Sequence, residues 1–499
     1  MSHSGAGAVT DAAAAASAPR RTILGQPIGI ATLFLTELWE RFTYYGIQSL
    51  LILFMVAPAA KGGLGLEDKS AASIYGLYVG GTYLFGLLGG WIADRLAGAQ
   101  RAVIAGGTLI AIGNTLLALG TTSIFFLGLL VIATGVGLLK PNVSALVAAL
   151  YPEGGARRDA GFSIFYMGIN TGGFLGPLVV PVIATAFGWR YGFGLTALGM
   201  LGGIATFLGM RRFLGGAGLA IAPEQRASWT PIVVLLALLA AAVVLVRSGW
   251  VHVDAALLAS FASWAFSLLA VAYFAYLLFF AGLSGTERKR ILVMVALFVA
   301  SVIFWAGYFQ QGGSFNLFAA RYTDMHILGW NAPPGVLQGA NSLFVIILAG
   351  VFAALWLALG RRDRDPPAAA KFSVALLLLG TGFLVMYFAA QRVRAGHLVL
   401  STWLIGAYFL HVCGEMCLSP VGLSNMSKLV PPRFVGQAMG MWFLSLALGG
   451  FLAGQLTGQY DANHLESLPA LFLEIFWYGV IAGVAMLLLT PLTKRLLTP

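Results

Sequence analysis

The chain has 499 residues, of which 59% are hydrophobic and only 9% are charged, and its mean hydropathy is +0.88. A soluble protein of this length needs more charge on its surface, so the composition indicates a membrane protein. The net charge of +11 comes from basic residues that lie in short clusters between apolar runs. Such clusters are typical of loops that set membrane topology, and they do not indicate a nucleic-acid-binding surface.

The beginning of the chain and its two cysteines indicate what kind of membrane protein this is. Residues 1–27 are rich in Ala, Gly and Ser. They lack the basic start and the strongly apolar core of a signal peptide, so we expect a disordered cytoplasmic tail. Cys413 and Cys417 lie one helical turn apart in an apolar run, a spacing that fits core thiols better than a disulfide or a zinc site.

Apolar runs bounded by charge, Gly or Pro predict the helices, since one span takes about 20 apolar residues. The first six lie at about 28–57, 70–94, 101–121, 123–151, 161–187 and 191–214. Two more, at about 230–248 and 255–282, predict a helical hairpin inserted in a linker over 215–288. The last six lie at about 289–318, 336–360, 370–391, 397–429, 433–458 and 466–494.

These runs predict an all-α polytopic fold with two six-helix bundles, over 28–214 and 289–495, and 14 transmembrane helices in all. With the N-terminus inside, 20 Lys and Arg residues fall on the cytoplasmic side and 7 on the other side. By the positive-inside rule both termini are then cytoplasmic. We expect a multi-pass protein of the bacterial inner membrane.

Five charged residues fall inside predicted spans, namely Glu37, Glu40, Arg41, Lys140 and Glu415. Each costs about 2.5–3.5 kcal/mol at the centre of a bilayer on insertion scales. They must therefore pair, become neutral or face a water-filled cavity, and intramembrane charge usually marks a functional site. The alternative is that they are structural ion pairs that lock helices together.

The first span places its charges on one helical stripe, because Glu37, Glu40, Arg41, Tyr44 and Gln48 are separated by three or four residues. Two carboxylates beside one guanidinium cannot both be fully compensated. At least one of them is therefore expected to take up and release a proton.

The other intramembrane charges suggest a ligand with two opposite charges. Lys140 precedes Pro141, which interrupts the hydrogen-bonding ladder of the fourth span, as expected where backbone lines a cavity. Glu415 stands alone in the tenth span, one turn after His411, which is either part of a proton relay or a core histidine. Cations in one half and an anion in the other suit a zwitterionic ligand such as a short peptide.

Several stretches together resemble the proton-dependent oligopeptide transporter family, bacterial type, of the major facilitator superfamily. The most specific contain the sequences ERFTYYG, FYMGINTG and GEMCLSPVGLS. The matching stretches occur in family order and are Glu37–Gly46, Gly89–Arg95, Thr134–Ser144, Phe165–Gly172, Phe304–Ala319, Gly414–Ser424 and Met439–Phe443. The resemblance implies the major facilitator fold, and bacterial members of the family also carry a central hairpin.

The resemblance also implies roles for individual residues. Glu37, Glu40 and Arg41 match the proton-coupling motif, Arg41 and Lys140 the site of the peptide carboxylate, and Glu415 the acid that receives the peptide amine. Asn170 and Asn341 match residues that assist at the amine, and the aromatic residues match walls of the pocket. The implied substrate-binding residues are Arg41, Tyr44, Tyr45, Tyr83, Lys140, Asn170, Trp305, Phe309, Gln310, Asn341, Glu415, Ser419 and Trp442.

One position departs from the family pattern. The family usually carries a glutamate four residues after the tryptophan of the seventh span, and Phe309 stands there in this chain. The usual ion-pair partner of Lys140 is therefore missing, with Asp324 as a candidate replacement. We expect proton coupling to depend more heavily on Glu37 and Glu40, and other contacts to close the gate between the halves.

The predicted function is proton-coupled symport of di- and tripeptides into the cytoplasm by alternating access. We expect a monomer that contacts small peptides and membrane lipids, with no nucleic acid, no metal and no cofactor besides the coupling proton. One alternative is a carrier of another small anion or metabolite, although the amine site at Glu415 argues against a simple anion. A second is a membrane peptide sensor that does not transport. No HExxH and no phosphate-binding loop occurs, so an enzyme is not predicted.

Overall fold

The computed structural model describes residues 22–497, apart from positions 24, 121, 154, 220–225, 231, 235, 236, 238–240, 242, 243, 246, 247, 249, 251–253, 328 and 461–465. Most of the predicted tail, residues 1–21 and 24, lies outside the described residues, while its last residues form short strands. About half of the first hairpin helix, about 230–248, also lies outside them.

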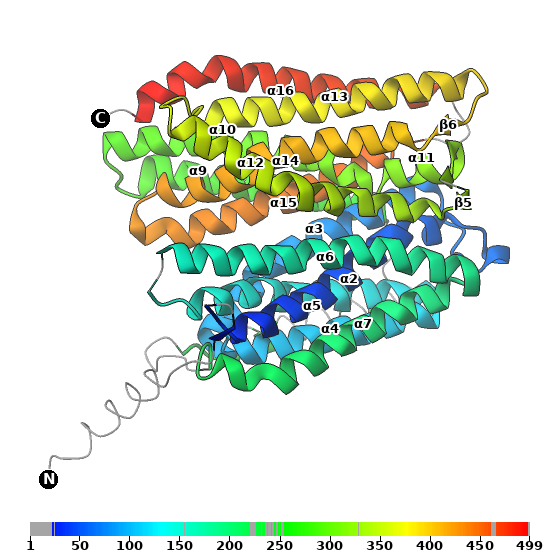
Figure 1. The fold of residues 1–499 in the computed structure, drawn as a ribbon, viewed down its shortest axis with the longest axis horizontal. Coiled ribbons are helices and arrows are strands. Elements are labelled where there is room, and N and C mark those ends of the chain that lie inside the picture. Colours follow the sequence, from blue (N-terminus) through cyan, green and yellow to red (C-terminus); the bar gives the residue numbers. More distant parts are fainter. Residues whose placement is uncertain are drawn as a thin grey trace, which may run out of the picture.

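Six long helices form the N-terminal bundle, in blue to green in Figure 1. They are α2 (Gly29–Val56), α3 (Asp68–Ile92), α4 (Ala99–Leu119), α5 (Thr122–Ala149), α6 (Gly155–Phe187) and α7 (Trp189–Met210). α2 packs against α6 and α7, while α4 packs against α5 and α7. The ends lie close to the predicted ones, except that α6 begins about one and a half turns earlier.

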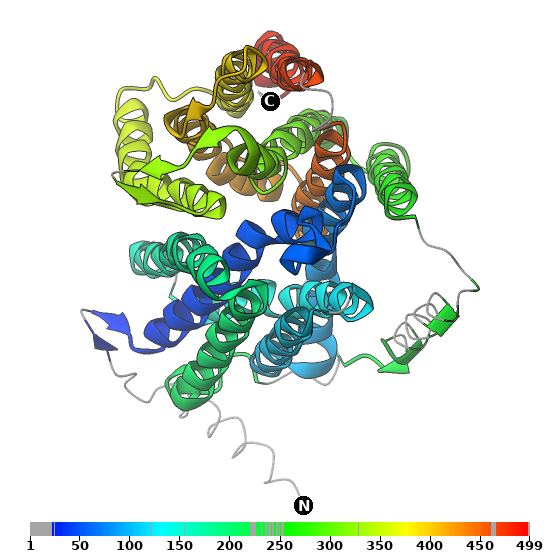
Figure 2. The same ribbon diagram turned by 90° about the vertical axis from the view of Figure 1, so that its right-hand side faces the viewer.

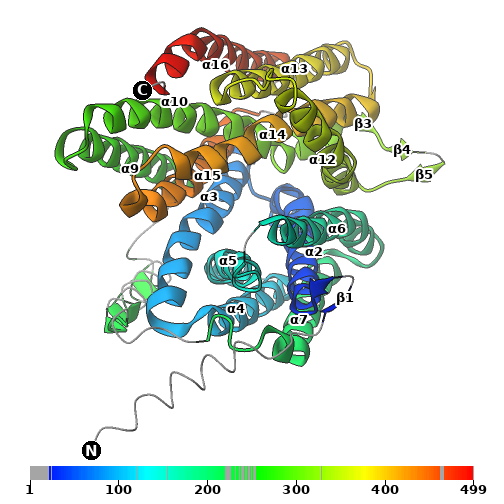
Figure 3. The same ribbon diagram turned by 60° about the vertical axis from the view of Figure 1, so that its left-hand side comes forward.

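The C-terminal bundle contains six further long helices, and Figure 3 shows it above the N-terminal bundle. They are α10 (Gly285–Tyr308), α12 (Gly339–Gly360), α13 (Ala368–Arg394), α14 (Thr402–Lys428), α15 (Val435–Thr457) and α16 (Ser467–Leu497), with the short α11 (Ser314–Tyr322) after α10. α13 packs between α14 and α16, and α10 packs against α15 and α16.

The seventh span, predicted over 289–318, is present as one candidate membrane span, Gly285–Tyr322, but its helix is interrupted. α10 ends at Tyr308, a 3-10 turn η6 (Phe309–Gln311) follows, and α11 starts again at Ser314. Two glycines form the break, because a Cβ at Gly312 would clash with the Tyr75 hydroxyl and a Cβ at Gly313 with Thr457. The break therefore brings the backbone close to α3 and α15.

α9 (Ala255–Ala275) belongs to the segment between the bundles and continues into a π-helical turn, η5 (Tyr276–Phe280). It packs against both α3 and α15. Asp254 caps its start by accepting from two backbone N–H groups. Ser284 and Glu287 form a capping box at the start of α10. The capping box fixes the start of α10 directly after the turn that follows η5.

Short elements lie at the ends of the long helices. The strands are β1 (Thr22–Ile23) paired with β2 (Gln26–Pro27), β3 (Thr323–Asp324) paired with β6 (Val399–Leu400), and β4 (His326–Ile327) paired with β5 (Trp330–Asn331). The other short helices are η1 (Ala59–Lys61), η2 (Ala93–Ala97), η3 (Arg211–Leu214), η7 (Pro334–Gln338) and η8 (Pro432–Phe434). The start of α2 and the end of α16 lie at the same end of the molecule, opposite to β5 and β6 (Figure 1).

Twelve helices of the described chain are long and apolar enough to cross a membrane. α2 is also long enough, at 28 residues, but its charged residues Glu37, Glu40 and Arg41 keep it out of these twelve. The fold class predicted from the sequence, an all-α polytopic membrane protein with two bundles and an inserted helical segment, is confirmed.

The two bundles meet along two pairs of helices, and Figure 2 shows them nearly end-on, with the C-terminal bundle above. α3 packs against α15, and α6 packs against α12. The first contact is very close, because a Cβ added at Gly76 would lie 2.7 Å from the Gly454 Cα. Side chains between these two contacts face a space enclosed by both bundles.

Candidate functional site

A cavity of about 490 Å³ lies between the bundles, bounded by helices from both of them. It collects side chains that are far apart in the sequence. All predicted site residues line it except Glu40, Asn170 and Gln310, so the cavity is lined by Glu37, Arg41, Tyr44, Tyr45, Tyr83, Lys140, Trp305, Phe309, Asn341, Glu415, Ser419 and Trp442.

The charges of α2 form one buried cluster. Arg41 Nε lies 3.0 Å from Glu37 Oε1 and also pairs with Glu40. All three side chains are nearly inaccessible to solvent. The helical repeat causes this arrangement, because Glu37 and Arg41 are one turn apart. A guanidinium shared by two buried carboxylates becomes available to another anion when one carboxylate is protonated.

Lys140 reaches the same cavity from α5, where the helix continues through Pro141. Its Nζ lies 4.4 Å from the centre of the Tyr83 ring, a cation–π contact. No carboxylate of the described residues lies within 4.0 Å of this Nζ. Asp324 instead lies beside His326, at 3.8 Å, at the end of the molecule that carries β4 and β5. It does not replace the missing partner of Lys140.

Glu415 provides the negative charge on the C-terminal side of the cavity. Its Oε2 accepts a hydrogen bond from the Tyr308 hydroxyl at 2.5 Å. Asn341 Nδ2 lies 2.9 Å from the Tyr308 oxygen and can donate to it. The three side chains come from α14, α10 and α12, so their hydrogen bonds hold the carboxylate of Glu415 in a defined direction.

Aromatic rings cover much of the rest of the wall. Phe309 stacks on Trp305, with ring centres 5.4 Å apart, and lies 5.8 Å from the Tyr83 ring of the other bundle. Tyr44 packs edge-on against Tyr45 at 5.3 Å. Where the family has a carboxylate, this chain therefore has an aromatic contact that links the bundles through Tyr83 to Lys140.

Polar groups without partners also face the cavity. Trp305 Nε1 and Ser419 Oγ are buried and have no hydrogen-bond partner among the described residues. Both belong to cavity-lining residues. A ligand with amide groups could satisfy them.

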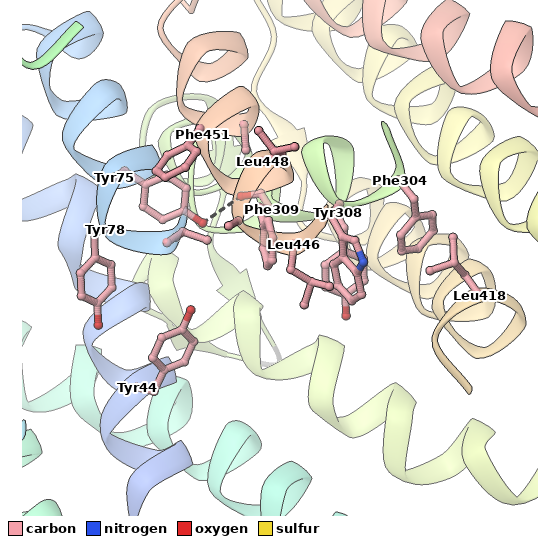
Figure 4. Close-up of a cluster of buried hydrophobic side chains, with 14 of the residues drawn as sticks. Tyr44, Tyr75, Tyr78, Phe304, Tyr308, Phe309, Leu418, Leu446, Leu448 and Phe451 are labelled. Atoms are coloured by element: carbon pink, nitrogen blue, oxygen red, sulfur yellow. Dashed lines mark hydrogen bonds between the residues drawn. The ribbon is translucent and has the colours of Figure 1, made fainter. Parts of the chain in front are cut away.

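One end of the cavity is closed by hydrogen bonds between the bundles. The Tyr75 hydroxyl donates to the Phe309 carbonyl at 2.9 Å (Figure 4) and accepts from Gln48 Nε2 at 3.0 Å. Asn316 Nδ2 donates to the Ser49 carbonyl at 3.0 Å. These contacts lie at the break between α10 and α11.

An ion pair closes the same end further out. Both terminal nitrogens of Arg321 contact Asp68, at 2.6 and 2.7 Å. Asp68 starts α3 and Arg321 lies in the last turn of α11, so the pair joins the bundles. The sequence places both residues near loops, and nothing in their spacing indicates the contact.

The other end continues into a second cavity of about 940 Å³. Tyr83, Lys140 and Trp442 line both cavities. The second one extends along the parts of α6, α12 and α15 that lie nearest the start of α2 and the end of α16. The structure is therefore closed at one end of the bundles and hollow towards the other.

Three predicted residues lie elsewhere. Asn170 lines the second cavity and donates to the Tyr166 carbonyl at 2.9 Å, apart from Glu415 and Asn341. Gln310 is fully buried, and its side chain bonds to α10, α11 and α15, so it packs the helix break and the neighbouring Gln311 lines the cavity. Glu40 is buried behind Arg41.

His411 does not face the cavity. It is fully buried, with its ring 5.0 Å from Phe383 and 5.5 Å from Phe315. The sequence left open whether His411 belongs to a proton relay or to the hydrophobic core. Its position agrees with a core histidine.

The cavity also contains residues that the sequence did not indicate. Tyr308 is the most important, because it holds Glu415, and its place three residues after Trp305 on the same helical face could have indicated it. Tyr166, Gln311, Phe352 and Trp356 complete the wall. Tyr166, Phe352 and Trp356 lie in long apolar helices and Gln311 lies in η6, and only packing brings them to the cavity.

Comparisons with known proteins agree with this architecture. The sequence profile of the POT family matches residues 100–477. The chain is 39% identical over 494 residues to the peptide transporter YePEPT of Yersinia enterocolitica, covering 96% of each chain. It is 31% identical over 489 residues to a di-/tripeptide transporter of Lactococcus lactis, covering 94% of this chain and 96% of the relative.

Solved structures have the same fold. A crystal structure of a peptide transporter POT in complex with sulfate has a TM-score of 0.89 and 39% identity, covering 97% of this chain and 98% of that chain. A POT family transporter in complex with 5-aminolevulinic acid has a TM-score of 0.88 and 30% identity, covering 96% and 99%. The chain therefore belongs to the POT family and has the major facilitator fold.

Proposed function

We propose that this chain is a proton-coupled symporter that carries di- and tripeptides into the cytoplasm. The observation that carries the proposal is the division of charge across one enclosed cavity. Arg41 and Lys140 lie on the N-terminal side, and Glu415 lies on the C-terminal side. A peptide with free ends presents a carboxylate to the cations and an amine to Glu415. Aromatic walls accept varied side chains between these fixed ends.

The names of the relatives support the same substrate class. The Yersinia relative is a peptide transporter, and the Lactococcus relative is a di-/tripeptide transporter. The volume of about 490 Å³ lies in the range of sites for small molecules. The family consists of transporters, so we propose no enzymatic reaction and no cofactor besides the proton.

Proton coupling follows from the cluster on α2. Arg41 is engaged by both Glu37 and Glu40, so a peptide carboxylate competes with them for the guanidinium. Protonation of one carboxylate releases Arg41 to the peptide. Loss of that proton to the cytoplasm lets the carboxylate reclaim Arg41 and favours release of the peptide. Each charge moved inward gains about 2.3 kcal/mol per 100 mV.

In alternating access the central cavity opens to one side of the membrane at a time. This structure is closed at one end of the bundles and hollow at the other. We propose that the hollow end, which lies on the side of the start of α2 and the end of α16, is cytoplasmic, and that the protein lies in the bacterial inner membrane. The closed end, with Tyr75, Phe309 and the Asp68–Arg321 pair, then faces outward. Because Phe309 cannot titrate, Glu37 and Glu40 carry the coupling in this chain.

Uptake into proteoliposomes tests the proposal. Labelled dialanine and trialanine are offered to purified protein with an inward proton gradient, and again after an uncoupler collapses it. We expect accumulation only with the gradient. Equilibration without accumulation would contradict the coupling, and no flux in a folded preparation would contradict peptide transport. A solved POT family transporter holds 5-aminolevulinic acid. The unlabelled compound is therefore added as a competitor, to test whether the site also takes a small acid that bears an amine but is not a peptide.

A further inference from the structure

A groove lies on the outer face of the molecule, between α9 and α10, with Leu448 of α15 at its floor. Figures 1 and 3 both show these three helices side by side. Its volume is about 470 Å³, and Ser267 is the only polar residue among those that line it. The walls are open to the surroundings, since Val271 is 64% exposed, Phe279 70% and Val299 50%. In a chain that spans a membrane, such a groove faces lipid.

The length of the groove matches one leaflet. Along α9 and η5 it runs from Ser267 to Phe279, and along α10 from Ile303 back to Leu292. At 1.5 Å per residue these stretches are about 18 and 16 Å long. Half of a hydrocarbon core of about 30 Å is about 15 Å. The groove thus extends from near the bilayer centre to one membrane surface.

Basic residues gather at the surface end of the groove. Arg288 and Lys289 precede Leu292 by four and three residues, so they lie on the groove face of α10. Both are exposed, as are Arg290 and Arg433. Arg433 Nη2 donates to the Ala281 carbonyl at 3.0 Å and so lies against the turn between η5 and α10.

Glu287, an acidic residue in the same region, does not neutralise these basic side chains. Glu287 Oε2 accepts from the Ser284 backbone N–H at 2.8 Å as part of the capping box. Its carboxylate is therefore turned towards the start of α10. Three basic side chains, those of Arg288, Lys289 and Arg433, remain for this acid at the mouth of the apolar groove.

We propose that the groove binds one acyl chain of an anionic phospholipid, whose phosphate headgroup is held by Arg288, Lys289 and Arg433. Basic sites beside transmembrane helices attract anionic headgroups, at about 1 kcal/mol for each Lys or Arg. A zwitterionic lipid fits the groove equally well but gains less from the cluster. The site is separate from the central cavity and does not depend on which substrate is carried.

Native mass spectrometry of the purified full chain tests the site. The protein in detergent is titrated with phosphatidylglycerol and with phosphatidylethanolamine of the same acyl chains, and separately with glycerol phosphate. We expect the first phosphatidylglycerol to bind at least tenfold more tightly than phosphatidylethanolamine, and glycerol phosphate to bind not at all. Equal affinity for the two lipids, or binding of the headgroup alone, would overturn the proposal.

Two pairs of variants assign the binding to this place. The double change Arg288→Gln with Lys289→Gln should weaken phosphatidylglycerol by on the order of 25-fold, about fivefold for each residue. The same change at Arg361 and Arg362, exposed in the loop after α12, should leave it unchanged. Val299→Trp fills the groove and should remove the bound lipid, whereas Leu268→Trp, also on the outer face but outside the groove, should not. Equal effects of a variant and its control would refute the assignment.

Discussion

The carboxylate of Glu415 is held by one tyrosine and has no basic partner within reach in the described structure. A partly buried carboxylate in this situation is ready to receive the amine of a ligand. Tyr308 keeps it directed at the cavity, and Asn341 supports Tyr308 from the next helix. The recognition of the substrate amine therefore depends on three helices of the C-terminal bundle.

Replacing Glu415 by Gln should weaken the binding of dialanine by about 10- to 150-fold, because a hydrogen bond to a charged group contributes about 1.5–3 kcal/mol. Binding of N-acetyl-dialanine, which has no amine, should hardly change. Isothermal titration of the purified variant measures both. Glu474→Gln, which changes an exposed carboxyl on α16, is the control. An equal loss for both ligands would contradict an amine site.

Replacing Glu40 by Gln should abolish accumulation driven by a proton gradient, because it removes one of the two carboxylates that compete for Arg41. Exchange of external for internal peptide needs no net proton movement and should persist. Both fluxes are measured in the same proteoliposomes. Full gradient-driven accumulation by this variant would show that Glu40 does not couple.

Replacing Tyr83 by Leu should weaken dialanine binding by about 2- to 30-fold, since a cation–π contact contributes about 0.5–2 kcal/mol to the position of Lys140. Tyr83→Phe keeps the ring and should retain the affinity. Dialanine amide lacks the carboxylate that Lys140 is proposed to bind, so Tyr83→Leu should not affect it. If Tyr83→Leu weakened binding of the amide as much as that of dialanine, Tyr83 would contribute only as part of the cavity wall and not by positioning Lys140.

Among the elements, α3 and α15 form the tightest contact between the bundles. Gly76 faces Gly454, and Gly80 faces the Phe451 ring, where an added Cβ would lie 2.5 Å away. Helices can approach so closely only where side chains are absent. This contact lies beside the closed end, so its packing determines how firmly that end stays shut.

Gly76→Ala should therefore destabilise the protein by about 1–3 kcal/mol, the usual cost of overpacking. Gly86→Ala, on the same helix, meets no atom within 4 Å and should be neutral or slightly stabilising. Thermal unfolding in detergent measures both variants. Equal melting temperatures for the two would contradict a close α3–α15 contact.

The break between α10 and α11 could not be predicted from the apolar pattern of this segment alone. The apolar run predicted one helix, because Gly312 and Gly313 alone do not end a helix with certainty. The Tyr75 and Thr457 side chains come from other helices and leave no room for a side chain at these glycines. The same break explains why Gln310, expected in the cavity, bonds to Ser314 and Thr457 instead.

For the whole molecule, the ion pair between Asp68 and Arg321 joins the bundles at the closed end. Both partners are partly exposed, so the pair contributes about 0.2–1 kcal/mol. Arg321→Gln should speed hydrogen exchange in α11 and at the start of α3 about two- to fivefold. The swap of Asp68→Arg with Arg321→Asp should restore slow exchange.

Hydrogen exchange followed by mass spectrometry measures this opening. Arg157→Gln removes an exposed pair with Glu153 at the other end of the bundles, and it serves as the control. If the swapped pair exchanged as fast as Arg321→Gln, the charge pair would not hold the closed end.

The sequence by itself determined the membrane class, the approximate positions of the long helices and the charged positions of the cavity. Each of these depends on local information: apolar length defines a span, and a charge inside a span must face a cavity or a partner. The motifs along the chain were enough to indicate the family. The stripe of Glu37, Glu40 and Arg41 needed only the helical repeat.

Only the tertiary structure decided which contacts replace the missing glutamate and which end of the cavity is closed. The Phe309–Tyr83 contact, the bond from Tyr75 to the Phe309 carbonyl and the Asp68–Arg321 pair each join residues more than 200 positions apart. Periodicity and spacing describe one helix at a time. The packing of one bundle against the other brings such distant residues together, and no local pattern contains that information.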